Sequence, residues 1–419
     1  MTTLTVHEWQ ELSIGTDGLT EAAAGRLHKL AERETRRLPV AQPILTRTAA
    51  PGLRAGQVVG VLTVPGACLE ILPKIGGEQE SDVRRSLIRM LAVALRLPIA
   101  DSEPSLMDRQ ERDLLEILVQ RFADGLLASA KRGLPHRYRQ REEDLPLLRG
   151  KLDIRRQLLQ HAARAERLAC VFEELSVDTP LNRVLRAAVV GLAHVVRTAD
   201  NRRKLNELVA RLEFVADTSD PLREPVMLDR TNTAFHRLYA LARLFLAGDW
   251  QSTSAGRQEG FGLLFAMNDL FEAFVGRSMQ AALAPTGRFV RLQRRDRHAL
   301  DDGREGFFEL KPDIVVDDIV IDTKWKSLCP GKKTLGVEQS DVYQMLAYSR
   351  AYQATRLVLL YPWQHGLPRG VCRTWHVSET STLFEVATVD VSKPDHVKTA
   401  LRELVEGPSS STHRSGCSV

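Results

Sequence analysis

The sequence predicts an α+β protein of several domains: a β-rich N-terminal module, a helical middle, and a C-terminal α/β domain with a central mixed sheet. Strand-like apolar runs near the N-terminus, helical apolar spacing in the middle and alternating strands and helices near the C-terminus predict this order. A length of 419 residues also fits two or three domains. We therefore expect boundaries that divide the chain into residues 1–80, 81–250, 251–406 and a disordered tail, 407–419.

Composition and charge are those of a folded protein. Hydrophobic residues make up 43% and charged residues 26%, and the formal charge of +5 permits a polyanionic partner without requiring one. The five cysteines are scattered, which favours a reduced, cytoplasmic protein without a cysteine-based metal site. No signal peptide is expected at the N-terminus, and the longest apolar run, Ala187–Val196, is too short for a membrane span. We expect no membrane partner.

The N-terminal module is predicted from a hairpin pattern. Residues 58–64 (VVGVLTV) form a strand, Pro65-Gly66 a turn and residues 69–72 the returning strand. A helix is expected before it, over residues 21–37.

The middle of the chain shows helical spacing from Ser81 onward. Two apolar stripes, within 87–97 and 114–126, predict helices, and more are expected over 180–198, 203–212 and 233–246. His136–Arg139 interleaves basic and aromatic residues, but a loop at a helix end is favoured over a nucleic-acid contact. A polar, Gly/Ser-rich stretch over 247–262 is the expected domain junction, followed by a helix over 263–283.

A short segment carries the candidate chemistry. Residues 310–326 read LKPDIVVDDIVIDTKWK, in which two β-branched runs flank Asp317-Asp318 as a hairpin turn. If Val316 pairs with Ile319, Asp313 lies directly opposite Asp322, with Cβ atoms about 5 Å apart. Lys324 then projects from the same face as Asp322, whereas Trp325 points away and is expected to pack in the core.

Two facing carboxylates with an ammonium group fit metal-assisted phosphodiester hydrolysis. The carboxylates repel each other unless a cation lies between them, and Mg²⁺ prefers such hard oxygen ligands, with Mn²⁺ able to substitute. Lys324 would orient or deprotonate the attacking water, or stabilise developing charge. The pattern alone is weak, because composition produces it in roughly one chain in ten of this length. A plain strand start at Asp313 and an exposed ion pair of Asp322 with Lys324 are the structural alternative.

Two further segments strengthen the interpretation. Upstream, the helix MNDLFEAFVGRSM carries Glu272; downstream, a helix over 341–352 places Gln344 and Tyr348 one turn apart on one face. Together these elements resemble the PD-(D/E)xK nuclease superfamily, including the QxxxY motif of its RecB-like branch. The resemblance implies that Asp313, Asp322 and Lys324 are catalytic, that Glu272 joins both aspartates as a metal ligand, and that Gln344 and Tyr348 are an accessory pair.

The chain also resembles the McrC family, the nuclease subunits of McrBC modification-dependent restriction systems. Seven segments follow the family order: LEILPKIGG, LRGKLDIRRQ, DTPLNRVLRAAV, MNDLFEAFV, LKPDIV, IDTKWK and DVYQMLAYSRAY. This resemblance implies a Mg²⁺-dependent endonuclease that cleaves DNA containing methylcytosine together with a McrB-like AAA+ GTPase oligomer. The N-terminal half would dock on that ring and stimulate GTP hydrolysis, while the C-terminal domain cuts.

Other features bear on partners. No GxxxxGK[ST] motif is present, since Pro330–Thr334 has its lysine and threonine out of register, so we expect no nucleotide to bind this chain. Basic residues around the hairpin are candidates for DNA backbone contacts, although a solvated basic loop is as good an interpretation: Arg288, Arg291, Arg294, Arg295, Arg297 and Lys326. His236, His298 and His365 have no partner at metal-ligand spacing and are expected to be surface or hydrogen-bonded histidines.

Two rival functions remain open. One is a non-cleaving assembly subunit that activates an AAA+ GTPase while its nuclease site is idle. The other is a stand-alone RecB-like repair nuclease that needs neither partner nor GTP.

Overall fold

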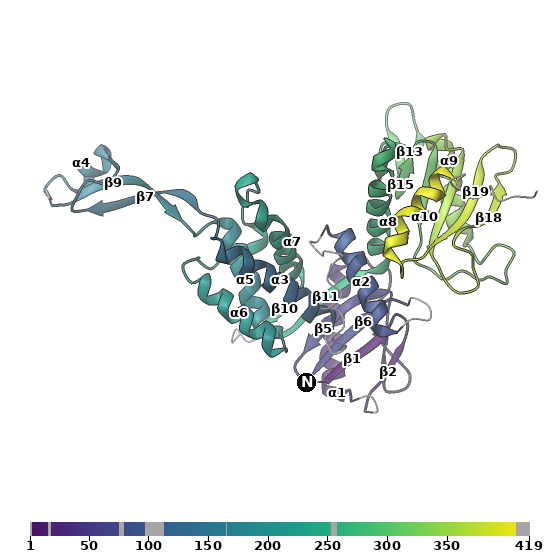
Figure 1. Cartoon of the computed structure of the whole chain (residues 1–419), viewed down its shortest axis with the longest axis horizontal. Helices are drawn as coiled ribbons and strands as arrows, with labels where there is room; N and C mark the ends of the chain where they lie inside the picture. The colour runs from purple at the N-terminus through teal and green to yellow at the C-terminus, as the bar shows by residue number, and fades with distance from the viewer. Residues whose placement is uncertain are drawn as a thin grey trace, which may run out of the picture. The chain divides into compact units, whose positions relative to one another are not determined.

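The computed structural model describes residues 2–15, 18–74, 79–96, 113–164, 166–252 and 258–407, which form two compact units (Figure 1). Unit 1 consists of Met1–Leu114 and Gly262–Val419, and unit 2 of Leu115–Phe261. The expected disordered tail falls almost entirely on residues outside those described. None of the described helices is long and apolar enough to cross a membrane.

The N-terminal part of unit 1 is built on a sheet with fully buried central strands. β1 (Thr2–His7) runs parallel to β6 (Ala67–Leu72), which pairs antiparallel with β5 (Val58–Val64), and every residue of β5 and β6 is buried. The hairpin predicted from VVGVLTV is confirmed. A smaller sheet contains β2 (Glu11–Ser13), β4 (Gly52–Ala55) and β3 (Leu45–Arg47).

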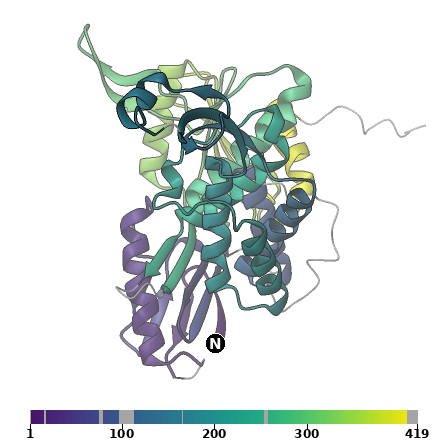
Figure 2. The same ribbon diagram turned by 90° about the vertical axis from the view of Figure 1, so that its left-hand side faces the viewer.

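One helix packs against the N-terminal strands. α1 (Glu21–Arg37) occupies the predicted residues and packs its apolar face on the sheet core (Figure 2). It begins where Thr20 Oγ1 accepts a hydrogen bond from Ala23 N, the usual N-cap arrangement. On the other side of β5 lies β11 (Gln258–Ala266). Gly60 permits this approach, because a Cβ at its φ of +132° would lie 2.0 Å from the Leu263 carbonyl oxygen.

The C-terminal part of unit 1 is built on a mixed sheet, as predicted, and the sheet has six strands. Its centre is parallel and its two edges are antiparallel. The strands lie in the order β12 (Val290–Leu292), β15 (Ile314–Val316), β16 (Ile319–Thr323), β17 (Arg356–Pro362), β19 (Leu383–Val389) and β18 (Gly370–His376). A separate exposed hairpin, β13 (Arg297–Asp301) and β14 (Gly306–Leu310), connects β12 to β15.

Helices flank this sheet. α9 (Gln339–Tyr352) contacts β16 and β17, and its Met345 and Tyr348 enter the core formed with the central strands. α8 (Met267–Leu283) packs against α10 (Pro394–Glu406) and α2 (Glu80–Ala94) (Figure 1). The predicted helix over 263–283 begins later, at Met267, because residues 263–266 continue strand β11. α2 lies in unit 1, although its helical spacing had grouped it with the middle of the chain.

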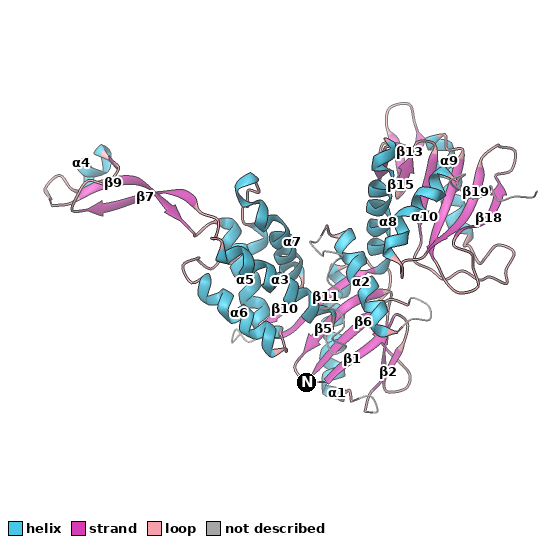
Figure 3. Ribbon diagram, viewed as in Figure 1, coloured by secondary structure: helices cyan, strands magenta, loops and turns pink. Residues whose placement is uncertain are grey.

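Unit 2 combines helices with a long hairpin (Figure 3). The larger helices are α3 (Leu114–Lys131), α5 (Pro180–Val195), α6 (Ala199–Arg211) and α7 (Thr233–Ala247), close to the predicted ranges. Short elements complete the unit: η2 (Pro221–Arg223), η3 (Arg230–Asn232) and β10 (Asp249–Ser252).

The hairpin, which we call the arm, was not predicted. It contains β7 (Arg137–Leu145), β8 (Lys151–Leu152), α4 (Ile154–Gln160) and β9 (Leu168–Ser176), and it extends from the helices of its own unit (Figure 1). The loop expected at His136–Arg139 is therefore wrong, since β7 begins at Arg137. The charged composition of β7 hid its strand character, because neither face of that strand is buried in a core.

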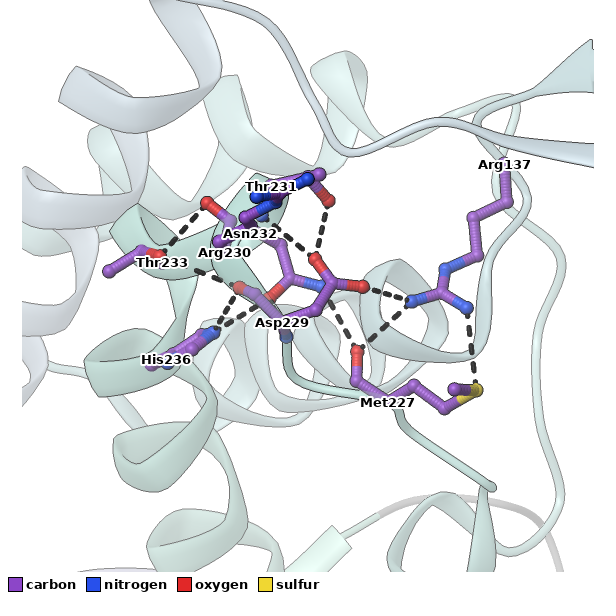
Figure 4. A network of polar contacts seen from close by, with 8 residues as sticks. All are labelled: Arg137, Met227, Asp229, Arg230, Thr231, Asn232, Thr233 and His236. Atoms are coloured by element: carbon purple, nitrogen blue, oxygen red, sulfur yellow. Dashed lines mark hydrogen bonds and ion pairs between the residues drawn. The ribbon is translucent and has the colours of Figure 1, made fainter.

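A polar network anchors the base of the arm (Figure 4). Arg137 Nη2 donates to Asp229 Oδ2 at 2.9 Å and to the Met227 carbonyl oxygen at 3.3 Å. Asp229 also caps η3, where it accepts a hydrogen bond from Thr231 N at 2.9 Å. His236 Nε2 lies 2.7 Å from Asn232 Oδ1, which confirms that this histidine is hydrogen-bonded within the fold.

Candidate functional site

The predicted hairpin forms in the predicted register. Ile314 pairs with Ile321 and Val316 with Ile319, so the same register extended by one residue places Asp313 opposite Asp322. All residues of β15 and β16 are buried, and the turn residue Asp317 adopts a left-handed φ of 53°, which aspartate tolerates. The two carboxylates therefore lie at one end of a rigid, apolar ladder.

Asp313 is held by the neighbouring strand. Its Oδ2 accepts hydrogen bonds from Thr323 N and Thr323 Oγ1, both at 2.7 Å. Burial, together with the negative charges of Asp322 and Glu272, raises the pKa of Asp313 to about 7 despite these hydrogen bonds. The site thus disfavours a full set of ionised carboxylates unless positive charge is added.

Asp322 and Lys324 form the second part of the site. The Asp322 side chain is 2% exposed, and its Oδ2 lies 2.7 Å from Lys324 Nζ. Burial raises the pKa of Asp322, and the nearby lysine offsets this shift only in part. For Lys324, burial lowers the pKa, but Asp322 and Asp341 outweigh it and leave the pKa raised. Lys324 is therefore an ammonium group at neutral pH.

Helix α9 supports the lysine from the other side. Lys324 Nζ donates to Gln344 Oε1 at 3.2 Å, and Gln344 Nε2 donates to Tyr348 Oη at 2.7 Å. Tyr348 Oη donates in turn to the Lys311 carbonyl oxygen at 2.9 Å. Burial raises the pKa of Tyr348 to about 12, so this phenol stays neutral. The predicted Gln344–Tyr348 pair thus links Lys324 to the segment just before Asp313.

Glu272 reaches the site from helix α8. Gln293 Nε2 donates to Glu272 Oε1 at 2.7 Å, while Gln293 N donates to the Asp313 carbonyl oxygen at 2.8 Å. The negative charge of Glu272 also contributes to the raised pKa of Asp313, after burial and Asp322. Five of the six predicted residues therefore lie around the end of the hairpin, and Glu272 is connected to Asp313 through Gln293.

Three residues of the site were missed. Thr323 and Gln293 act through the contacts above, and neither residue type signals a role by itself. Asp341 is 9% exposed in its side chain and lies 3.7 Å from Lys324 Nζ and 3.3 Å from Lys326 Nζ. It stands one helical turn before Gln344, a spacing that could have identified it.

The basic residues predicted to contact DNA are mostly engaged with acidic neighbours. Arg294 pairs with Asp296 at 2.5 Å, Arg295 approaches Glu309 at 3.9 Å, and Arg288 lies 3.2 Å from Asp317. Lys326 pairs with Glu338 at 2.9 Å. Arg291 is exposed on edge strand β12. Apart from Lys326, which shares Asp341 with Lys324, these cations are not gathered around the carboxylates.

The carboxylate set fits a hard divalent cation by its chemistry. Among the described residues, no three His, Cys, Asp or Glu side chains are arranged closely enough to enclose a metal ion. Asp313 and Asp322 nevertheless bring hard oxygen ligands together, with Glu272 nearby, at a cost in mutual repulsion that a cation would remove. The arrangement therefore fits an open site that shares its ion with water and a phosphate better than a closed protein cage.

We compared the chain with protein families and with solved structures. A family profile described as "McrBC 5-methylcytosine restriction system component" matches residues 53–362. No curated protein matches the chain. A chain of the half-complex from a tetradecameric assembly of Thermococcus gammatolerans McrB AAA+ hexamers with bound McrC shares the fold, with a TM-score of 0.75 and 22% identity over 96% of this chain and 99% of that chain. A chain of the Thermococcus gammatolerans McrBC complex has a TM-score of 0.56 and 25% identity over 67% of this chain and 88% of that chain.

Proposed function

The chain belongs to the family of McrBC 5-methylcytosine restriction system components, and we propose that it is the DNA-cutting subunit of such a complex. The observation that carries the proposal is the meeting of Asp313, Asp322 and Lys324 at one end of a buried hairpin, in the PD-(D/E)xK pattern. The reaction would be Mg²⁺-dependent hydrolysis of a phosphodiester bond in DNA that contains methylcytosine.

Each side chain has a role that follows from its environment. Asp313 and Asp322 would hold the ion, with Glu272 supporting it from α8. When bound, Mg²⁺ supplies a Lewis acid that lowers the pKa of a coordinated water and neutralises charge on the phosphate. The raised pKa of Lys324 argues against a general base and for an ammonium that orients the water or stabilises the developing charge. Gln344 and Asp341 keep that ammonium in place.

The partner would be an AAA+ GTPase. One of the similar structures contains McrB AAA+ hexamers with bound McrC, and we propose a corresponding ring for this chain. Nucleotide binding would lie in the ring. In this sequence the stretch most similar to a phosphate-binding loop is Pro330–Thr334, and its lysine and threonine are out of register with the GxxxxGK[ST] motif.

We place the partner contact on the arm. Helix α4 has no buried residue. Five large apolar side chains in α4 and in the loop between β7 and β8 are at least 59% exposed: Leu147, Leu148, Ile154, Leu158 and Leu159. A cluster of exposed apolar side chains on a projecting hairpin is typical of a protein-binding surface. Arg137 fixes the base of the arm, so a partner would meet a pre-ordered element.

The proposal is tested by cleavage of methylated plasmid with this chain, its AAA+ partner, GTP and Mg²⁺. Asp313→Asn should abolish cutting, because the amide cannot supply an anionic ligand. Asp317→Asn is the matched control: it makes the same chemical change four residues away, in the exposed turn, where asparagine tolerates the left-handed φ.

The two rivals give different outcomes. Failure of the wild type to cut, with GTP hydrolysis by the partner still stimulated, would establish the assembly subunit. Cutting of plain linear DNA without partner or GTP would establish the stand-alone nuclease. Cutting that needs GTP and disappears only in Asp313→Asn supports the proposed function.

A further inference from the structure

Trp325 connects the candidate site to a distant part of the sequence. It lies between Lys324 and Lys326, and its side chain is 6% exposed, as expected for a residue that points away from the carboxylates. Its ring meets Phe271 edge-to-face, with centroids 5.3 Å apart, and Phe271 precedes Glu272 on α8. Its indole Nε1 donates to Glu8 Oε2 at 2.9 Å, although Glu8 lies 317 residues earlier in the chain.

Glu8 is held firmly by the N-terminal sheet. It follows β1, and its backbone N donates to the Leu72 carbonyl oxygen at 3.0 Å. Its Oε2 accepts a second hydrogen bond, from Lys74 N, at 3.1 Å. The residue is 2% exposed, so this acceptor is fixed within the fold rather than free to rotate in water.

Gln57 holds the backbone of the same tryptophan. Gln57 Nε2 donates to the Trp325 carbonyl oxygen at 2.6 Å, and Gln57 itself precedes strand β5. Its own carbonyl oxygen accepts a hydrogen bond from Met267 N at 3.4 Å, at the start of α8. The N-terminal sheet therefore contacts both the side chain and the main chain of Trp325.

These contacts matter because β16 ends at Thr323, just before the lysine. Lys324 N donates to the Leu360 carbonyl oxygen at 2.9 Å, the last backbone link to the neighbouring strand β17. Beyond it, the segment that aims Lys324 depends on how Trp325 is held. A shift of a fraction of an ångström there moves the ammonium relative to Asp322 and Gln344.

We propose that Glu8 is a positioning residue for the nuclease site, through which the N-terminal sheet sets the geometry of Lys324 by holding Trp325. The inference rests on the proposed function. It makes the N-terminal sheet part of the cutting apparatus and gives that sheet a route by which its own displacement changes cleavage.

The test compares four single variants, and the double variant of the first two, in the assembled complex. Glu8→Ala removes the acceptor, and Trp325→Phe removes the N–H but keeps a ring against Phe271. Glu8→Gln keeps a carbonyl acceptor, and its NH₂ group takes the place of Oε1, for which the described residues supply no hydrogen bond. Glu21→Ala is the matched control, an exposed glutamate of the same module paired with Arg47 at 3.0 Å.

We expect Glu8→Ala and Trp325→Phe each to lower kcat by about 10- to 100-fold, the usual range for groups that orient catalytic residues. KM for DNA should stay unchanged, the double variant should be no worse than either single one, and Glu8→Gln should restore most of the rate. Should Glu8→Ala fail to fold, Trp325→Phe carries the same comparison. The inference is overturned if Glu8→Gln lowers kcat as much as Glu8→Ala does. It is also overturned if kcat is unchanged in Glu8→Ala, or unchanged in Trp325→Phe.

A second measurement separates this inference from the proposed function. Amide hydrogen exchange over residues 322–326 should be faster in Glu8→Ala and Trp325→Phe and unchanged in Glu8→Gln and Glu21→Ala. If the wild-type complex does not cut DNA, these exchange rates still report whether Glu8 holds the segment. Unchanged exchange in Glu8→Ala would refute the positioning role even in an active enzyme.

Discussion

Two of the antiparallel hairpins, β15–β16 and the arm, differ in where they place charge. In β15–β16 every residue is buried, and at its end Asp313, Asp322 and Lys324 interact in a confined, low-dielectric environment. In the arm, β7 and β9 pair over nine residue pairs, yet charges such as Arg141 and Glu174, 2.7 Å apart, meet where solvent reaches both side chains.

The difference teaches where a charge can do chemistry. Buried charges interact strongly because little solvent screens them, so their pKa values shift and the site favours a cation. Surface ion pairs of the arm contribute little to stability, because water competes for both partners. The arm instead exposes apolar side chains, which water does not satisfy and a protein partner can cover. This contrast is why we propose catalysis for the first hairpin and recognition for the second.

The largest expected effect is a loss of DNA cleavage on substitution of a carboxylate at the end of the β15–β16 hairpin. Asp322→Asn should lower cleavage by more than about 100-fold, since a metal ligand matters at least as much as the groups that orient one. In the metal-free protein, loss of the 2.7 Å ion pair with Lys324 costs stability, but the penalty that burial places on the ionised carboxylate disappears with it, so the net change in the free energy of unfolding should be small. Cleavage assays and thermal unfolding in a chelator measure both effects. If the melting temperature falls so far that the variant is unfolded under the assay conditions, unfolding explains the loss of activity and Asp322 is mainly structural.

The second prediction addresses the arm. Replacing Leu158 and Leu159 together by serine should weaken binding to the AAA+ partner by about 10- to 100-fold, as expected for apolar anchors of an interface. The free energy of unfolding should change by no more than about 0.5 kcal/mol per site, because these side chains are exposed. Binding can be measured by interferometry and stability by urea unfolding.

Phe214→Ser is the control for the arm. Phe214 is 78% exposed in unit 2 but lies outside the arm, so it tests whether any exposed apolar residue has this effect. Equal weakening of binding by the control would remove the assignment of the partner surface to the arm.

The same contrast explains what sequence could predict. The hairpin over Ile314–Ile321 was predictable to its register, because its β-branched runs, its turn and its buried faces all specify one pairing. Gln344 and Tyr348 were predictable from helical spacing. In the arm, by contrast, β7 reads RYRQREEDL, in which solvent faces both sides and no apolar alternation marks the strand.

Long-range contacts account for the rest. Nothing local to Glu8 indicates that it meets Trp325, because that contact depends on how the N-terminal sheet packs against the segment after β16. Likewise, residues 263–266 have a composition that suits a buried helix as well as a strand, and their place beside β5 decides between the two. Tertiary packing, rather than local preference, determines such elements.

The smallest expected effect is a dependence of Mg²⁺ affinity on pH, which arises from Asp313 at the end of the buried hairpin. The pKa of Asp313 is about 7, above its ordinary value, so the folded, metal-free protein holds a proton that the unfolded chain releases near its ordinary value of about 4. Its contribution to stability therefore falls as pH rises from about 4 to 7 and is constant above that. Mg²⁺ must displace this proton, so its affinity should rise about tenfold between about pH 6 and about pH 8.

Calorimetric titration of Mg²⁺ without DNA, in buffers of different ionisation enthalpy, measures both the affinity and the proton released. The wild type should release close to one proton per ion at about pH 6 and almost none at about pH 8, because Asp313 is already ionised there. In Asp313→Asn the affinity should be low and its dependence on pH much weaker. Binding of Mg²⁺ without proton release at the lower pH would mean that Asp313 is ionised before the ion arrives, and that the buried hairpin tolerates its two carboxylates without help.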